Sequence, residues 1–446
     1  MLGSAPAVHA GKHAGGGKAK NLILLVADGM NTGTLSLAHH HSKTTRDRDT
    51  VWMQLYREPG VIHSLQETRS ANSVVTDSAA AGSAWGIGER INNGAINRTP
   101  DGREPVPAWI RALEAGKATG LVTTTRMTHA TPACFAVNVR HRNMEDAIAE
   151  QYLKRGIDVL LGGGSVHFEA GRREDGKDLF RAFGKAGYDV VRNREGLMAA
   201  SGKKGRLLGT FFESHLPYTQ DHDHYAPYRR DVPTLAEMTS TALGRLGSKP
   251  EGFVLMVEGG RVDHAGHAND GPSILKEQLA FDDAIAVARD YAAKDPDTLL
   301  IVTTDHGTGG AMLNGVGQAY LDTDEAFARV TQSRHSFEFL MPRLVGDGAD
   351  PGAIVEAGLG FVPDGQLLRS LEETVKTIRA GSGNVRSLSR DLAPALAERT
   401  GIAFTSQNHT ADLVELVATG PGSENIPPYL LNYELHGLMM GALGLG

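Results

Sequence analysis

The chain has 446 residues, of which 41% are hydrophobic and 22% are charged, a composition typical of a soluble globular protein with a large core. Its net charge of −7 argues against nucleic acid as a partner, because no stripe of lysine and arginine offers contacts to phosphates. No apolar run reaches the roughly 18 residues that a membrane span requires. The single cysteine, Cys134, excludes an intrachain disulfide.

The first 20 residues are mostly Gly, Ala, His and Lys and follow no pattern. This composition predicts a flexible leader or the remnant of a secretion signal. A complete signal peptide is not expected, because no apolar stretch precedes "AVHA". We expect residues 21–446 to form a single domain.

Several near-continuous apolar runs follow, and such runs are typical of strands buried on both faces of a parallel sheet. They cover residues 22–30, 119–132, 157–164, 252–260 and 298–307. Helical patterns lie between them, at residues 233–246 and 273–294. This alternation predicts an α/β fold with three layers, α/β/α, built on a large and mostly parallel central sheet.

Residues 310–403 differ from the rest of the chain. The stretch 343–365 is rich in glycine and proline, and the stretch 366–380 has the pattern of an amphipathic helix. We expect this part to be an insertion in the main domain that serves as a lid, a crown-like element or a dimer contact.

Polar side chains stand where the apolar runs end. Ligands of open α/β folds bind beyond the carboxyl ends of the strands, so these side chains are candidates for one common site. They are Asp28, His129, Glu258, Asp305 and His306.

Two further motifs carry residues of the kinds that bind metals. "VEGGRVDHAGH" places Asp263 and His267 four residues apart, on one face of a helix, and "SQNHTADL" supplies His409. Mixed carboxylate and imidazole sets suit Zn²⁺, whereas a set of oxygen donors such as Asp28 and Thr131 suits Mg²⁺. Each of these fragments, taken alone, is more often structural.

The segment "NSVVTDSAAAGSAWG" places one serine between a strand-like run, Val74–Thr76, and an alanine-rich helix. One interpretation is a helix cap, since Asp77 and Ser78 are both favoured at that position. The other interpretation makes Ser78 a nucleophile, because a helix N-terminus favours an anion and the small neighbours leave room for one.

Six motifs together resolve this choice: "ADGM", "TDSAAAG", "THATP", "VEGGRVDHAGH", "TTDHG" and "NHT". In this order they resemble the alkaline phosphatase family over about residues 21–310 and 404–440. The resemblance implies metal-dependent hydrolysis of phosphate monoesters through a phosphoserine intermediate, with release of an alcohol and inorganic phosphate.

The resemblance also implies a role for each matching residue. Ser78 corresponds to the nucleophile. The ligands of the zinc that activates it would be Asp28, Asp305 and His306, and those of the second zinc would be Asp263, His267 and His409. Asp28 would also bridge to a magnesium held by His129, Thr131 and Glu258.

The resemblance also implies an arginine that grips phosphate, about 13 residues after His129. Arg142 stands at that place, and Arg140 is its rival. His129 and His264 follow the animal members of the family, whereas the best-studied bacterial members hold Asp and Lys there. We therefore expect His129 to ligate the third metal and His264 to face the bound phosphate; the alternative for His264 is a residue on the helix surface.

The family resemblance further implies a homodimer, small-molecule phosphate monoesters as substrates, and a periplasmic or secreted location in a bacterium. Rival functions are those of a phosphodiesterase, a sulfatase or a non-catalytic binding protein on the same fold. A sulfatase is disfavoured because Ser78 is followed by two alanines instead of a C-x-P-x-R-type sequence. Thr131, Glu258 and Arg142 favour monoesters over diesters.

Overall fold

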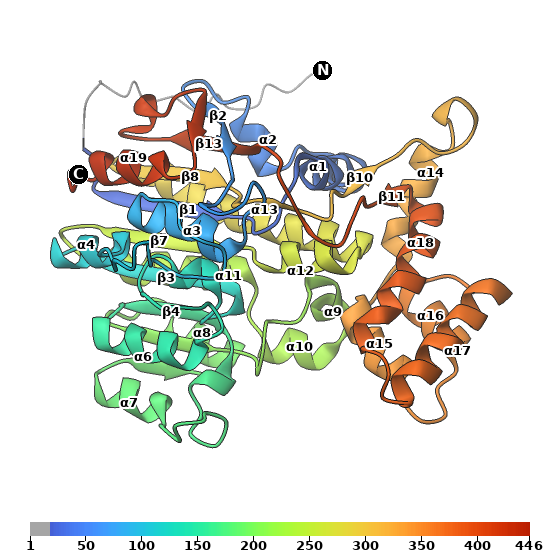
Figure 1. The fold of residues 1–446 in the computed structure, drawn as a ribbon. Helices are drawn as coiled ribbons and strands as arrows, with labels where there is room; N and C mark the ends of the chain where they lie inside the picture. The colour runs from blue at the N-terminus through green and yellow to red at the C-terminus, as the bar shows by residue number, and fades with distance from the viewer. Residues whose placement is uncertain (1–17) are drawn as a thin grey trace.

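The computed structural model describes residues 18–446 and contains one large, mostly parallel sheet (Figure 1). Its ten strands lie in the order β14-β2-β13-β8-β1-β7-β3-β4-β6-β5. Among its pairings only those of β13 are antiparallel. The strands are β1 Asn21–Val26, β2 Ile62–Glu67, β3 Ala118–Arg126, β4 Val159–Gly163, β5 Asp189–Val191, β6 Leu207–Thr210, β7 Phe253–Glu258, β8 Thr298–Thr303, β13 Val414–Thr419 and β14 Tyr429–Leu431.

Helices cover both faces of the sheet, which confirms the three-layer α/β/α fold. One apolar core lies between the sheet and α1 Thr32–Arg46, α2 Val51–Leu55, α8 Arg194–Ala200, α11 Leu235–Leu246 and α13 Gly271–Lys294. The other lies between the sheet and α3 Ser78–Ile87, α4 Ala108–Glu114, α6 Glu145–Arg155, α7 Leu179–Lys185 and α19 Glu434–Ala442. Strand β1 supplies alternate residues to each core, because successive side chains of a strand point to opposite faces.

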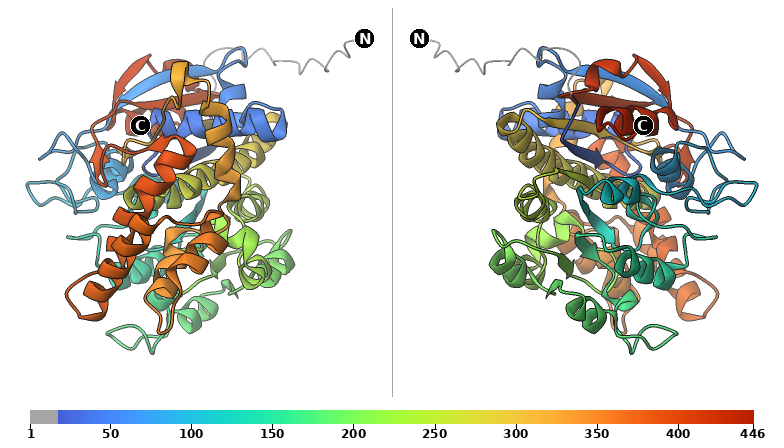
Figure 2. Two further views of the ribbon diagram at one scale, coloured as in Figure 1. Left: turned by 90° about the vertical axis from the view of Figure 1, so that its right-hand side faces the viewer. Right: turned by 90° about the vertical axis from the view of Figure 1, so that its left-hand side faces the viewer.

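Two short antiparallel pairs lie where the chain leaves the sheet after β8 and returns to it. Strand β9, Gly307–Thr308, pairs with β12, His409–Thr410, and β10, Met312–Leu313, pairs with β11, Ile402–Ala403. The helices between them gather beside α9, α10 and α12 at one side of the molecule (Figures 1 and 2). They are α14 Thr323–Ala328, α15 Phe337–Leu344, α16 Pro351–Leu359, α17 Gly365–Arg379 and α18 Ser389–Thr400.

Much of this segment packs on an apolar cluster of its own, which includes Phe337, Leu371 and Leu392. The expected insertion at 310–403 and its role as a lid, crown-like or dimer element stay predictions. The remaining α-helices are α5 Ala130–Ala133, α9 Thr219–His224, α10 Ala226–Asp231 and α12 Arg261–Ala268. Among residues 18–446, no helix combines the length and the apolar character of a membrane span. The leader expected at residues 1–20 lies outside the described residues except for 18–20.

The strand-like run Val74–Thr76 is not a strand, so this prediction was wrong. Val74 is 63% exposed, and the segment is an irregular loop. Its backbone is held by side chains instead of a neighbouring strand: the amide of Asn93 donates to the carbonyl of Val75 at 3.0 Å and accepts from the N–H of Asp77 at 3.1 Å. These contacts outweigh the preference of β-branched residues for strands.

Candidate active site

Four neighbouring strands of the sheet, in the order β8-β1-β7-β3, end at the same edge and carry the candidate site. Asp28 follows β1, His129 follows β3, Glu258 is the last residue of β7, and Asp305 and His306 follow β8. All five side chains are buried. The parallel register therefore brings together the side chains that the sequence places after separate apolar runs.

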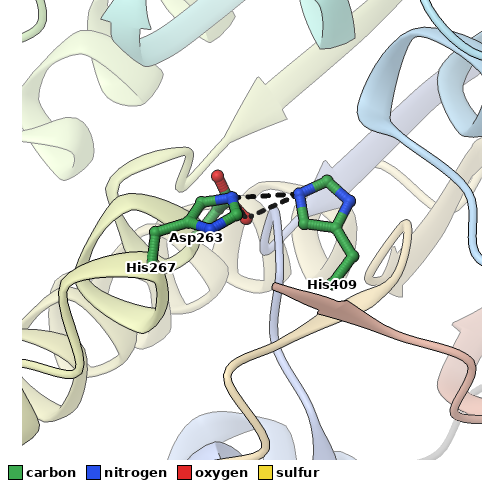
Figure 3. Close-up of side chains that lie close together, drawn as sticks. All are labelled: Asp263, His267 and His409. Carbon is green, nitrogen blue, oxygen red and sulfur yellow. Dashed lines mark hydrogen bonds and ion pairs between the residues drawn. The ribbon is translucent and has the colours of Figure 1, made fainter. Parts of the chain in front are cut away.

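Three ligand atoms from α12 and β12 form a compact triangle (Figure 3). Asp263 Oδ1 lies 3.4 Å from His267 Nε2 and 3.5 Å from His409 Nε2, and the two Nε2 atoms are 3.1 Å apart. Ligands placed tetrahedrally at zinc distances are separated by roughly 3.3 Å. The triangle therefore has the dimensions of three corners of a zinc site.

The proton positions on these two imidazoles strengthen that conclusion. His267 Nδ1 donates to the carbonyl of Gln407 at 2.6 Å, and His409 Nδ1 donates to the carbonyl of Thr76 at 2.8 Å. When both imidazoles are neutral, their Nε2 atoms point unshared electron pairs at each other. A bound cation accepts both pairs, and a hydrogen bond from Nδ1 to a carbonyl is the usual support of a metal-ligating histidine.

A second set of ligand atoms surrounds His306. Its Nε2 lies 3.2 Å from Asp305 Oδ2, 3.6 Å from Asp28 Oδ1 and 3.2 Å from the hydroxyl of Ser78. Asp263 lies close enough to complete a group with Asp28 and His306, so it stands between the first two sets. Two cations held by these sets would be near neighbours, as in sites where two metals act on one phosphate.

The helix cap and the candidate nucleophile are two different residues. The carboxylate of Asp77 caps α3 by accepting from the N–H of Ala80 at 2.9 Å. Ser78 is the first residue of the helix, and its hydroxyl faces His306. The hydroxyl is therefore free for chemistry at the positive end of the helix dipole.

The third set joins the ends of β1, β3 and β7. His129 Nδ1 lies 3.6 Å from Glu258 Oε1 and 3.9 Å from Asp28 Oδ2, and the hydroxyl of Thr131 donates to Asp28 Oδ2 at 3.3 Å. Glu258 is oriented by its other oxygen, which accepts from the hydroxyls of Thr123 and Thr125. Its Oε1 is thereby left facing the set.

Four ligand atoms of the second and third sets are buried and have no hydrogen-bond partner: Asp28 Oδ1, His129 Nδ1, Glu258 Oε1 and Asp305 Oδ2. Burial and then the neighbouring carboxylates raise the pKa of Asp28 well above its ordinary value, and the same causes raise the pKa of Asp305 to about 8. A divalent cation reverses this balance by favouring the ionised forms. The donor set therefore fits metal ions.

Arg142 joins this site, whereas Arg140 is exposed. The Arg142 guanidinium donates to Asp77 Oδ2 at 3.1 Å and to His129 Nε2 at 2.9 Å. It therefore lies between Asp77, which precedes Ser78, and the third set.

His264 is half-buried on α12, and its ring packs against other side chains. Arg261 donates to its Nδ1 at 2.8 Å, and its ring centroid lies 5.8 Å from that of His129 and 4.3 Å from that of His215. Sequence reasoning missed Arg261 and His215, together with Thr308, which donates to Asp263 Oδ1 at 2.6 Å. The run "TTT" consists of polar residues inside the buried strand β3. Buried hydroxyls need partners, so this run could have pointed to the missed threonines that orient Glu258.

The family model for alkaline phosphatase matches residues 19–445. The chain belongs to the alkaline phosphatase family. Alkaline phosphatase 3 of Bacillus subtilis (strain 168) is 33% identical to it, over 93% of this chain and 87% of that protein. The repressible alkaline phosphatase of Saccharomyces cerevisiae is also 33% identical, over 90% of this chain and 76% of that protein.

Solved structures of the alkaline phosphatase family agree with the fold. The Thermus thermophilus enzyme superposes with a TM-score of 0.89 at 35% identity, covering 99% of this chain and 96% of that one. The cold-active enzyme of Shewanella sp. gives 0.80 at 29% identity, covering 95% and 99%. Hydrolysis of phosphate monoesters is the activity of the family, so this chain is a metal-binding phosphate monoester hydrolase.

Gly29, in the loop that follows β1, lies against Asp263 of α12. Its φ is +76°, and a Cβ atom there would lie 2.6 Å from the Cα of Asp263. Gly29→Ala is expected to lower the unfolding free energy and the metal content, because the backbone of Asp263, a candidate ligand, must move. Gly60→Ala is the matched control: its φ is +86°, no atom lies within 4 Å, and it bears only the cost of about 1–2 kcal/mol of a left-handed conformation.

Chemical denaturation and metal analysis of both variants check this expectation. Equal losses of stability with unchanged metal content in both would contradict the close approach of Gly29 to Asp263.

Proposed function

We propose that Ser78 attacks the phosphorus of a monoester and becomes a phosphoserine. The observation that carries this proposal is the 3.2 Å contact of the Ser78 hydroxyl with His306 Nε2, inside a set of metal-ligand atoms at the start of α3. The Ser78 oxygen forms a bond to phosphorus, the ester P–O bond breaks, and the alcohol leaves with a proton. Water then cleaves the phosphoserine, releases inorganic phosphate and restores the hydroxyl.

The three sets are proposed to hold two Zn²⁺ ions and one Mg²⁺ ion. Two zinc ions suit the mixed imidazole and carboxylate sets around His306 and His409, and magnesium suits the oxygen donors of Asp28, Thr131 and Glu258. When bound, such ions lower the pKa of the serine hydroxyl and stabilise the departing and attacking oxygens. His306, His267 and His409 hold their ligand atoms in place through hydrogen bonds from Nδ1.

Arg142 is proposed to bind the phosphoryl group. Because Arg142 also contacts His129, phosphate binding is expected to depend on whether the third set holds a metal. If His129 ligates a metal through Nδ1, its proton resides on Nε2. A guanidinium only donates, so an Nε2–H ends the hydrogen bond from Arg142 that is seen at 2.9 Å. That donor is then available to a phosphoryl oxygen, so loading of the third set and phosphate binding are expected to support each other.

His264 is proposed to face the bound phosphate beside this arginine. A neutral imidazole at alkaline pH adds no positive charge next to the product, which favours release compared with a lysine. We also propose that the enzyme acts on small-molecule phosphate monoesters as a homodimer in the periplasm or outside a bacterial cell. The family resemblance and the leader-like residues 1–20 support these proposals.

Ser78→Ala is expected to abolish phosphoserine formation and most turnover, because it removes the oxygen that is proposed to bond to phosphorus. The measurement is acid trapping of labelled phosphate followed by peptide mapping. Ser83→Ala is the control: Ser83 lies on the same helix, where its hydroxyl accepts from the N–H of Asn97 instead of facing His306. Label on any residue other than Ser78 in the unaltered enzyme would refute the assignment.

Removal of metals is expected to abolish turnover and to lower the unfolding temperature, because ligands that bind only the folded state stabilise it. Zinc together with magnesium should restore both quantities. Because the ligands bind metal in their deprotonated forms, the affinity for metal should fall as the pH is lowered. Full activity at a metal content near zero, measured by mass spectrometry, would contradict the metal mechanism.

Arg142→Ala is expected to weaken inhibition by inorganic phosphate about 10- to 150-fold, the loss of a charged hydrogen bond. The metal content should stay unchanged. Arg140→Ala is the matched control, because Arg140 is exposed and is expected to leave phosphate inhibition as it is. If the control shows the larger effect, the phosphate-binding arginine is Arg140.

A monoester and a diester of the same chromogenic alcohol, offered to the unaltered enzyme, separate the remaining alternatives. Faster turnover of the monoester supports the proposal. Preference for the diester would favour a phosphodiesterase, and no turnover of either by the metal-loaded protein would favour a binding protein.

A further inference from the structure

Arg261 is a buried arginine that links three parts of the molecule. Its guanidinium donates to His264 Nδ1 at 2.8 Å and to Glu338 Oε1 at 2.7 Å, and it lies over the ring of Tyr218 at 3.8 Å. Only 2% of the Arg261 side chain is exposed. Glu338 belongs to α15, between β10 and β11, so the segment inserted there reaches the site through this arginine.

The contact with His264 has a chemical consequence. An arginine side chain has donors and no acceptor, so His264 Nδ1 must accept. A neutral imidazole that accepts at Nδ1 carries its only proton on Nε2. The opposite tautomer would turn an N–H of His264 toward the N–H of Arg261 and present an electron pair at Nε2.

The neighbouring side chains restrict the orientation of the His264 ring and of the Arg261 guanidinium. The ring of His215 packs on its ring at 4.3 Å with an interplanar angle of 72°, and His129 lies beyond at 5.8 Å. Arg261 is itself held at its other donor by Glu338 and across its face by Tyr218. The two ends of the guanidinium therefore fix one orientation, and that orientation selects one tautomer of His264.

We propose that Arg261 is a positioning residue that keeps His264 in the Nε2–H tautomer, with Glu338 holding the guanidinium in place. This inference rests on the proposed function, in which His264 faces the bound phosphate. An Nε2–H donates to a phosphoryl oxygen, whereas a bare Nε2 repels it. The inserted segment thereby contributes to phosphate affinity without a residue in contact with phosphate.

The first test is a double-mutant cycle on the metal-loaded enzyme, with inhibition by inorganic phosphate as the readout. Arg261→Met and His264→Ala are each expected to weaken phosphate binding about 3- to 10-fold, the loss of one hydrogen bond. The double variant should be no weaker than the His264→Ala variant, because Arg261 acts through His264. Effects that multiply, with unchanged metal content, would overturn the proposal.

The second test reads the tautomer directly and separates positioning from a purely structural role. Nitrogen-15 NMR of histidine-labelled enzyme, with the resonance assigned by His264→Ala, distinguishes a proton on Nε2 from one on Nδ1. The expected result is Nε2–H in the unaltered enzyme and a mixture in the Arg261→Met variant. A proton on Nδ1 of His264 in the unaltered enzyme would overturn the proposal.

Glu338→Gln provides a variant that keeps the fold if Arg261→Met does not, because the Glu338 side chain is 61% exposed. Phosphate inhibition should weaken about 2- to 3-fold, since a neutral amide holds the guanidinium less firmly. The matched control is Glu325→Gln, which removes an exposed pair with Arg329 in the same segment. Equal phosphate inhibition in the two variants would contradict the proposal that Glu338 holds the Arg261 guanidinium in place.

The failure of the proposed function is distinguishable from the failure of this inference. Unchanged phosphate affinity in the His264→Ala variant would mean that His264 does not face phosphate, which refutes the proposed function. The NMR measurement on the Arg261→Met variant still decides whether Arg261 sets the tautomer.

Discussion

The crowding of unshared electron pairs around Asp28 and Asp263 is the constraint on which the rest of the site depends. The sheet brings several carboxylates and imidazoles into one buried region, where oxygens of Asp28, Glu258 and Asp305 have no hydrogen-bond donor. Burial and mutual repulsion raise the pKa values of Asp28 and Asp305, so the protein alone does not stabilise them as ions. Bound cations would offset this cost, and in the proposed function the same cations activate Ser78.

The fold holds this arrangement because the backbone elements that carry the candidate ligands are themselves fixed in the sheet or packed against it. Four adjacent parallel strands bring their carboxyl ends to one edge, and α12 adds two ligands one helical turn apart. The pairing of β9 with β12 returns the chain after about a hundred residues, so that His409 meets Asp263. The segment between these strands contributes Glu338 and its contact with Arg261.

The sequence predicted the sheet, and it predicted that the candidate ligands lie together, because both depend on local signals: long apolar runs, and polar residues directly after them. That these residues bind metal stays a prediction. Sequence reasoning failed at Val74–Thr76, where contacts from the distant Asn93 override β-branched propensity. It could not find Glu338 as a partner of Arg261, because a contact between residues 77 positions apart leaves no local pattern. The spacing of Arg261 and His264, three positions apart on α12, was a local signal that was missed. For Ser78 the sequence left two interpretations open until the family motifs were considered together, and the structure separates the capping carboxylate of Asp77 from the hydroxyl.

Anomalous X-ray diffraction from crystals of the enzyme loaded with zinc and magnesium tests the central claim most directly. Data collected on both sides of the zinc absorption edge should give two zinc peaks, one among Asp263, His267 and His409 and one among Asp28, Asp305 and His306. The third set, around Glu258, should show electron density without a zinc signal. The absence of a zinc peak from either of the first two sets would contradict the account.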